Sequence, residues 1–281
     1  MTMREFELDI AAGRIRGLRN GGNGPKVLAL HGWLDNAASF VPLAAHLADL
    51  DLVAPDLPGH GRSDHLPPGT EYTFAGALHN VLDIADALGW ERFALLGHSM
   101  GAGIASLVAA GCPQRVERLV AIEALGALPE SAERTTARLR EAVSATRGLR
   151  GKRLRVFVDP QPAVRARMQA NALSEPVARL LVERGLADVD GGHTWSSDPR
   201  LTVPTMVRMT DAQVDDLVAG IECPTRVIYA DPPQPYLPEP DRSRRARLLP
   251  RGDLTVLPGG HHLHMENPRD VAAAIGRFFH G

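Results

Sequence analysis

The sequence has few cysteines, little net charge and no long apolar run, and each absence excludes a class of protein. Only two isolated cysteines occur in 281 residues, which excludes a disulfide framework and a cysteine-rich metal site. The formal net charge of −2 gives no general attraction to nucleic acid or to anionic membranes. No apolar run approaches the length of a membrane span, and the N-terminal segment lacks the apolar core of a secretory signal. These observations predict a cytoplasmic protein with no nucleic-acid or membrane partner.

What the sequence does contain is an alternation of short apolar runs with amphipathic segments. Strands are expected at residues 6–10, 14–18, 27–30, 52–54, 93–96, 119–122, 225–229 and 255–257, and helices at 40–50, 74–88, 99–111 and 269–279. Such alternation is typical of a mostly parallel sheet covered by helices on both faces, so an α/β fold is predicted. From about residue 125 to 221 the pattern becomes helical and rich in arginine. We therefore expect a core domain of residues 1–124 and 222–281, and a helical lid of residues 125–221.

The most informative stretch is Gly97-His98-Ser99-Met100-Gly101, between an apolar β-like run and a helix of small residues. A chain that turns from strand to helix in so few residues crowds its own backbone. Glycines two places before and two places after the corner residue remove the side chains that would collide there. The corner residue is then held in a strained conformation with its side chain pointing outward. This pattern predicts that Ser99 is a nucleophile rather than a helix cap.

A serine hydroxyl needs a neighbouring base to become a nucleophile, and histidine is the side chain suited to that role near neutral pH. Among the eleven histidines, location favours His261 and His262. Their loop follows the last predicted strand and opens at the same edge of the sheet as Ser99. Adjacent residues project differently, so the residues alone leave both as candidates. A metal site from this pair with His264 is disfavoured because no carboxylate or cysteine lies nearby at ligand spacing.

Four segments, in this order, resemble an α/β-hydrolase of the serine-nucleophile type, and within that superfamily the serine hydrolase-like group. The segments are His31-Gly32-Trp33, Asp56 to Ser63, Gly97 to Gly101, and Gly260-His261 followed by Glu266-Asn267-Pro268. The resemblance implies an α/β-hydrolase fold, in which a mostly parallel sheet is flanked by helices and a helical lid follows the sixth strand. It also implies that His261, five residues before Glu266, is the catalytic histidine.

An oxyanion forms during acyl transfer and needs preorganised N–H donors, which the start of a helix supplies. Met100 N–H, directly after the nucleophile, is expected to be one donor, and the resemblance implies Trp33 N–H as the other. The residues expected to line the substrate pocket are Leu34, His98, Trp195 and His262. Asp56 and Arg62 are expected to hold their own glycine-rich loop by hydrogen bonds. Nine arginines of the insertion are interpreted as solvated, with a positive lid that selects carboxylate-bearing substrates as the alternative; they stand at positions 134, 138, 140, 147, 150, 153, 155, 165 and 167.

The third triad member departs from the family pattern. In most relatives it is an aspartate after the seventh strand, three residues beyond a glycine, but here those two positions are Ala230 and Pro233. Asp231 lies two residues before the expected position. Glu123, at the end of the sixth strand, stands where some α/β-hydrolases carry the acid, and a lone glutamate ending an apolar strand is costly to bury without a partner. We expect Glu123 to orient the histidine, with Asp231 as the alternative acid.

The predicted function is hydrolysis of a carboxylic ester through an acyl-enzyme intermediate on Ser99, with no metal and no organic cofactor. Dehalogenase and epoxide hydrolase chemistry is disfavoured because those enzymes use an aspartate at the corner position. Thioester, lactone or carbon–carbon bond hydrolysis with the same triad is an alternative. A non-catalytic hydrolase-like protein that binds a small ligand is another. The expected partner is a small ester-like substrate, and the sequence does not specify an oligomeric state.

Overall fold

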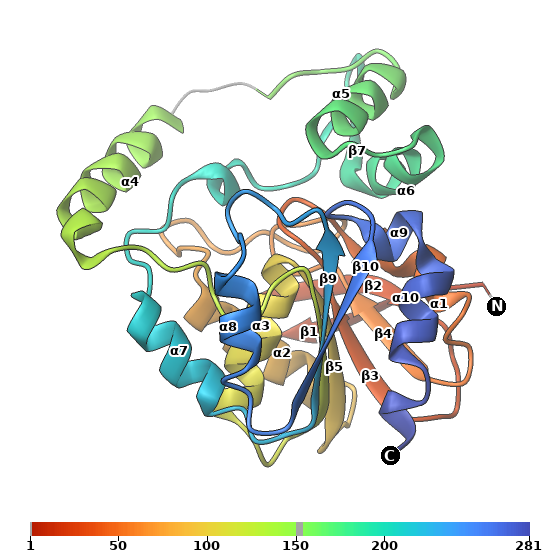
Figure 1. Ribbon diagram of the computed structural model, residues 1–281. Helices are drawn as coiled ribbons and strands as arrows, with labels where there is room; N and C mark the ends of the chain where they lie inside the picture. The colour runs from red at the N-terminus through yellow and green to blue at the C-terminus, as the bar shows by residue number, and fades with distance from the viewer. Residues whose placement is uncertain (1, 150–153) are drawn as a thin grey trace.

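A computed structural model describes residues 2–149 and 154–281, and its centre is an eight-stranded sheet (Figure 1). Across the sheet the strands follow the order β1-β2-β4-β3-β5-β6-β9-β10. Their bounds are β1 Arg4–Ile10, β2 Gly13–Arg19, β3 Lys26–Leu30, β4 Asp51–Pro55, β5 Phe93–His98, β6 Val116–Ile122, β9 Thr225–Asp231 and β10 Gly252–Pro258. The pairs β1–β2 and β2–β4 are antiparallel, and the five remaining neighbouring pairs are parallel. The sheet is mostly parallel, as predicted.

Burial along the strands explains why the sequence pattern identified them. Every residue of β4 and β5 is buried, and in β3 only the first residue is exposed. A parallel strand covered on both faces is apolar along its whole length, which is the pattern that residues 27–30, 52–54 and 93–96 display. The outer strand β1 instead alternates between exposed and partly buried residues.

Helices cover both faces of the sheet (Figure 1). One face packs against α2 (Phe74–Ala87), α3 (Met100–Gly111), α7 (Asp211–Ala219) and α8 (Asp241–Ala246). The other face packs against α1 (Val41–Ala44), α9 (Leu263–Glu266) and α10 (Pro268–Ile275). Each face has its own continuous apolar cluster, so the sheet forms the middle layer of three. No helix in the described part of the chain is long and apolar enough to cross a membrane.

The segment between β6 and β9 carries helices and a small hairpin. Its elements are α4 (Thr135–Leu149), α5 (Gln161–Asn171), α6 (Glu175–Gly185), β7 (Leu186–Val189) and β8 (Gly192–Trp195). The helices α5 and α6 lie beyond the carboxyl ends of the parallel strands, whereas α4 lies to one side (Figure 1). Phe157, Val164 and Leu181 form a separate apolar cluster here that also includes Met265 of the core. The hairpin was not expected from the sequence, because its two strands have only four residues each.

Three boundaries differ from the sequence expectations. Helix α7 falls within the expected lid of residues 125–221, but its Val214 and Val218 are fully buried in the same cluster as α3, so packing assigns it to the core. The expected helix 40–50 is only a 3-10 turn followed by α1. The expected helix 269–279 ends at Ile275, because Gly276 has φ +52°. Residues 150–153 of the expected lid lie outside the described residues.

Candidate active site

Ser99 stands at the sharp turn between β5 and α3 with φ 51° and ψ −118°, which is strained for a residue other than glycine. The neighbouring glycines have no space for a side chain. A Cβ on Gly97 would lie 2.4 Å from the Cα of Ala102, and a Cβ on Gly101 would lie 1.9 Å from the backbone oxygen of Leu30. The two glycines therefore permit the strand, the turn and the helix to pack this closely. The corner geometry expected from the sequence is present.

His261 reaches Ser99 from the loop between β10 and α9. The Ser99 hydroxyl donates to Nε2 of His261 over 2.9 Å, although 162 residues separate the two in sequence. His262 points elsewhere and is 4% exposed, with its Nε2 toward Asp35. Of the two histidines that the sequence left open, the structure brings His261 to the serine.

Glu123 reaches the other side of the His261 ring. It directly follows β6, is 3% exposed and has φ 60°. Nδ1 of His261 donates to Oε2 of Glu123 over 3.1 Å, and the backbone N–H of Ala230 donates to Oε1 over 2.6 Å. Asp231, the alternative acid, is exposed at the end of β9. Among the described residues, the carboxylate that pairs with His261 is that of Glu123 and not that of Asp231. The structure therefore joins the histidine to Glu123.

Tyr236 is a neighbour of His261 that the sequence analysis missed. Its hydroxyl lies 3.0 Å from Nδ1 and 3.4 Å from Nε2, with the two rings edge to face. Burial of the hydroxyl and the charge of Glu123 raise the pKa of Tyr236, so the phenol stays neutral. The tyrosine comes from the proline-rich segment 232–240, which follows β9. No spacing rule in the sequence connects this loop to His261.

The expected oxyanion donors, Met100 and Trp33, come from two separate segments of the chain. Met100 is the first residue of α3, where backbone N–H groups have no partner within the helix. Trp33 follows β3, and the next residue, Leu34, has φ 57°. The indole of Trp33 is 52% exposed, and its N–H donates to the backbone oxygen of Leu201 over 2.8 Å.

Backbone strain is concentrated at this site. Among the described residues, four residues other than glycine have positive φ, and three of them are Leu34, Ser99 and Glu123. The fourth, Ala172, ends helix α5. Strained residues persist only where the surrounding structure holds them, and they occur preferentially at functional sites.

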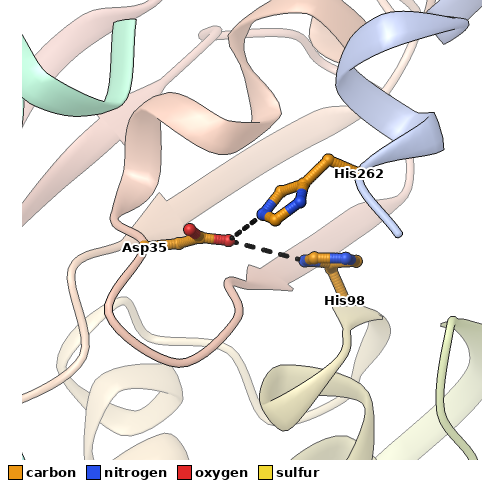
Figure 2. A group of neighbouring side chains, drawn as sticks. All are labelled: Asp35, His98 and His262. Atoms are coloured by element: carbon orange, nitrogen blue, oxygen red, sulfur yellow. Dashed lines mark hydrogen bonds and ion pairs between the residues drawn. The ribbon is translucent and has the colours of Figure 1, made fainter. Parts of the chain in front are cut away.

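Two of the four residues expected to line a pocket have a different environment. His98 and His262 are buried and face Oδ2 of Asp35, at 3.6 Å from Nδ1 of His98 and 3.2 Å from Nε2 of His262 (Figure 2). That part of the expectation is wrong, because the side chains next to Ser99 and His261 turn into the interior. Trp195 packs edge to face against Phe157 within the insertion, with ring centroids 5.9 Å apart. Leu34 is partly buried.

Asp35, His98 and His262 are the group of described residues that could most readily hold a metal ion. The ligand atoms of Asp35, His98 and His262 all lie within 4.8 Å of one another. The guanidinium of Arg167 already pairs with the other oxygen of Asp35. A divalent cation would therefore leave two uncompensated positive charges in a buried site, which is strongly disfavoured. The residues fit a hydrogen-bonded group better than a metal centre.

Ionic contacts of Arg184 and Arg167 help to dock the insertion onto the core, and Arg184 also pairs with Glu5 of β1 over 2.7 Å. The buried carboxylate of Asp56 accepts hydrogen bonds from the backbone N–H groups of Ala37 and Arg62, and also from Arg184 at the end of α6. The expectation that Asp56 holds its loop is confirmed, with Arg184 as an addition. Arg167 of α5 pairs with Asp35, as described above.

Of the seven described arginines between residues 134 and 167, five are exposed, as expected, and two are not. Arg138 is 7% exposed and pairs with Glu130, and Arg167 is only partly exposed. Those expected to be solvated and found exposed are Arg134, Arg140, Arg147, Arg155 and Arg165. Arg150 and Arg153 lie outside the described residues.

Comparisons with known proteins agree with this architecture. A family model described as alpha/beta hydrolase fold matches residues 25–179. A serine hydrolase-like protein from Danio rerio is 29% identical over 297 aligned residues, which cover 99% of this chain and 90% of the relative. A hypothetical protein from Pseudomonas aeruginosa has a crystal structure with a TM-score of 0.92 and 40% identity, over 100% of both chains. A thioesterase domain from the curacin biosynthetic pathway has a TM-score of 0.85 and 27% identity, over 98% of this chain and 99% of that one.

The family model covers more than half of the chain, and the relative from Danio rerio aligns along nearly all of it. The resemblance inferred from the four sequence motifs is thereby confirmed, including its similarity to the serine hydrolase-like group. The chain belongs to the family of proteins with the α/β hydrolase fold.

Proposed function

We propose that the protein hydrolyses carboxylic esters through an acyl-enzyme intermediate on Ser99. The observation that carries the proposal is the continuous chain of contacts from the Ser99 hydroxyl to His261 and on to Glu123, with distances of 2.9 and 3.1 Å. These are the contacts that a nucleophile, its base and the group that orients the base require.

In the first half of the reaction, Ser99 Oγ attacks the ester carbonyl carbon while Nε2 of His261 takes the hydroxyl proton. The tetrahedral intermediate then collapses and its carbon–oxygen bond to the alcohol breaks. Nε2 of His261 returns the proton to the departing alkoxide oxygen. In the second half, water attacks the acyl-serine and loses its proton to His261, which protonates Ser99 Oγ as the acid leaves.

Glu123 keeps the Nδ1 proton of His261 in place during both halves and balances the charge of the imidazolium. The Ala230 N–H holds the second oxygen of that carboxylate, which limits its rotation. We propose the backbone N–H groups of Met100 and Trp33 as oxyanion donors. One such donor contributes roughly 10²–10³-fold to kcat in other acyl-transfer enzymes.

We further propose that the helical part of the insertion is a lid that shapes the substrate pocket. Its helices α5 and α6 lie over the carboxyl ends of the strands (Figure 1), where open α/β sheets bind their ligands. The contacts of Arg184 with Asp56 and of Arg167 with Asp35 support a docked arrangement. In this proposal α7 belongs with the core.

Thioester hydrolysis is a second candidate, since the curacin thioesterase domain is similar over nearly the whole chain. The same triad can attack a thioester, because the acyl-serine intermediate is identical and only the leaving group differs. Parallel assays of p-nitrophenyl esters and N-acetylcysteamine thioesters with matched acyl groups separate the two candidates. A preference for thioesters at every acyl length would replace the ester proposal by the second candidate.

The proposal is tested by Ser99→Ala, with the exposed α4 residue Ser144→Ala as the matched control. We expect the wild type and the control to hydrolyse a panel of p-nitrophenyl esters and to react with a fluorophosphonate probe. The Ser99→Ala variant should do neither while it keeps the wild-type circular dichroism spectrum. Hydrolysis by Ser99→Ala at a rate near that of the wild type would exclude an acyl-serine mechanism.

A further inference from the structure

Asp35 lies at the centre of a buried polar group beside the proposed active site (Figure 2). It stands in the loop that follows β3 and is 3% exposed. One carboxylate oxygen faces His98 and His262, and the other accepts a hydrogen bond from Arg167 of α5. The reaction steps described above make no use of this carboxylate, although its burial carries a large desolvation penalty.

The histidines that face Asp35 are chain neighbours of the proposed catalytic residues. His98 directly precedes Ser99, and His262 directly follows His261. Asp35 itself belongs to the loop of the proposed oxyanion donor. One carboxylate therefore connects three segments that are distant in sequence, those that carry the nucleophile, the base and the oxyanion donor.

The hydrogen bonds determine which atoms of this group carry protons. Nε2 of His98 donates to the backbone oxygen of His261 over 2.8 Å. Burial lowers the pKa of His98 to about 4, so this ring is neutral at pH 7 and its Nδ1 has a lone pair. The hydrogen bond to Asp35 then comes from Nε2–H of His262. His262 and Arg167 are thus the donors that stabilise the buried carboxylate.

The charge state of Asp35 agrees with this arrangement. Burial alone opposes its ionisation, but the charge and hydrogen bond of His262 and the charge of Arg167 hold the pKa of Asp35 well below its usual range. Space around the carboxylate is also limited. A Cβ on Gly32 would lie 2.9 Å from Oδ2 of Asp35 and 3.0 Å from Nδ1 of His98. Movement of Asp35 would therefore displace the backbone of the oxyanion loop or the two histidines.

We propose that Asp35 is a positioning residue, which holds His261 and the oxyanion loop in register with Ser99 through His262, and that Arg167 of the insertion completes this arrangement. The inference rests on the proposed function. Asp35 is buried and takes no part in the proposed reaction steps, so its loss should lower kcat and leave KM nearly unchanged. Displacement of a catalytic group by about 1 Å costs roughly 10²-fold in rate, which sets the expected size of the effect.

The first test compares Asp35→Asn with Asp51→Asn. Asp51 is also buried and pairs with Arg19 through two hydrogen bonds of 3.0 and 2.7 Å, but it starts β4 at the edge of the sheet opposite Ser99. Both variants lose one buried charge. We expect a fall of about 10²-fold in kcat for Asp35→Asn alone, with KM within about threefold of the wild type. An equal loss in Asp51→Asn, or a kcat of Asp35→Asn within twofold of the wild type, would overturn the proposal.

The second test uses Arg167→Met, which keeps the length of the side chain and removes the charge, and Arg167→Lys, which restores the charge. We expect kcat to fall in the methionine variant and to recover in the lysine variant. A loss that lysine does not reduce, with the melting temperature unchanged in both variants, would show that the charge on Asp35 is not what matters.

The third test is independent of turnover. The Nδ1 proton of His261 should give a resolved downfield proton resonance in the wild type, because Glu123 holds it in a hydrogen bond. In Asp35→Asn this signal should broaden through faster exchange, whereas Asp51→Asn should keep it. An unchanged signal in Asp35→Asn would overturn the positioning role. Failure of wild-type Ser99 to react with a fluorophosphonate would instead count against the proposed function, and the resonance would still test Asp35.

Discussion

The substitution Glu123→Gln tests the least expected part of the proposed triad. Both carboxylate oxygens have a partner, since Oε1 accepts the N–H of Ala230 over 2.6 Å and Oε2 accepts the Nδ1 proton of His261 over 3.1 Å. Glutamine has nearly the same size, but only one of its two terminal atoms can accept a hydrogen bond. The N–H of Ala230 is fixed in the backbone and cannot become an acceptor. It therefore selects the orientation in which the glutamine oxygen faces Ala230 and the amide NH₂ faces His261.

In that orientation Nδ1 of His261 must accept a hydrogen bond, so the ring proton moves to Nε2. Nε2 then donates to Ser99 Oγ and cannot take its proton. The wrong tautomer and the loss of charge stabilisation together lower the rate about 10⁴-fold in the equivalent aspartate-to-asparagine change, or about 5 kcal/mol of transition-state stabilisation. We expect kcat/KM of Glu123→Gln for a p-nitrophenyl ester to fall by that order.

The matched control is Asp231→Asn, at the exposed end of β9. Its activity should stay within about threefold of the wild type, since surface substitutions change free energies by roughly 0.5 kcal/mol or less. Circular dichroism melting of both variants separates a catalytic loss from unfolding. Retention of more than a tenth of the activity by Glu123→Gln would refute the tautomer argument. A larger loss in Asp231→Asn would identify Asp231 as the acid, and mild losses in both would indicate a Ser99–His261 dyad.

Three further predictions concern the tyrosine, the buried histidines and the turn at Ser99. Tyr236→Phe should change kcat less than tenfold, because a neutral hydrogen bond contributes only about 1 kcal/mol and Glu123 still holds Nδ1; a loss comparable to that of Glu123→Gln would make Tyr236 the orienting group. Burial lowers the pKa of His31, His60 and His98 to about 4, about 3 and about 4, so below an unfolded value of about 6.5 the unfolded chain binds more protons. Above about pH 6.5 these histidines do not change the free energy of unfolding with pH. As the pH falls from there towards 4, each of the three should lower the free energy of unfolding by up to about 1.4 kcal/mol per pH unit. A melting temperature that does not change between pH 7 and pH 5 would contradict this. Gly101→Ala should destabilise the fold by about 3 kcal/mol or more, because the new Cβ would collide with the backbone of Leu30. On α4, a Cβ added to Gly148 would meet no described heavy atom within 4 Å apart from its chain neighbours and the backbone of its own helix, so Gly148→Ala should be neutral or stabilising by up to about 1 kcal/mol. Equal melting temperatures in the two variants would show that the turn can relax.

The strands of the core could be predicted from the sequence because their burial is nearly uniform. The runs that became β3, β4 and β5 are apolar along their length, and the turn after β5 has glycines at the two positions where a side chain cannot fit. Elements with weaker local signals were predicted less well. The hairpin β7–β8 is short, and α7 has the amphipathic pattern of any surface helix, so its pattern could not show which domain it covers.

Some residues of the proposed active site could likewise be predicted from the sequence, and others could not. The loops that carry Ser99 and His261 could be found from motifs, since turn chemistry and strand order place them at one edge of the sheet. The positions of Tyr236, Asp35 and Arg167 could not, because each depends on how a loop or an insertion folds back onto that edge. The sequence also does not show which way His98 and His262 point, and they were predicted to line the pocket. In the structure they face Asp35 in the interior.

The sequence by itself thus determined the sheet, the strained turn at Ser99 and the short list of possible bases and acids, since these depend on local periodicity and backbone sterics. Only the tertiary structure decided which members of the list meet. His261 rather than His262 reaches Ser99, and Glu123 rather than Asp231 reaches His261. The physical reason is that a hydrogen bond requires its two atoms to lie within about 3 Å, with a suitable angle. Glu123 and His261 are separated by 138 positions in sequence, and Ser99 and His261 by 162. Each pair meets that condition only through the packing of the whole domain.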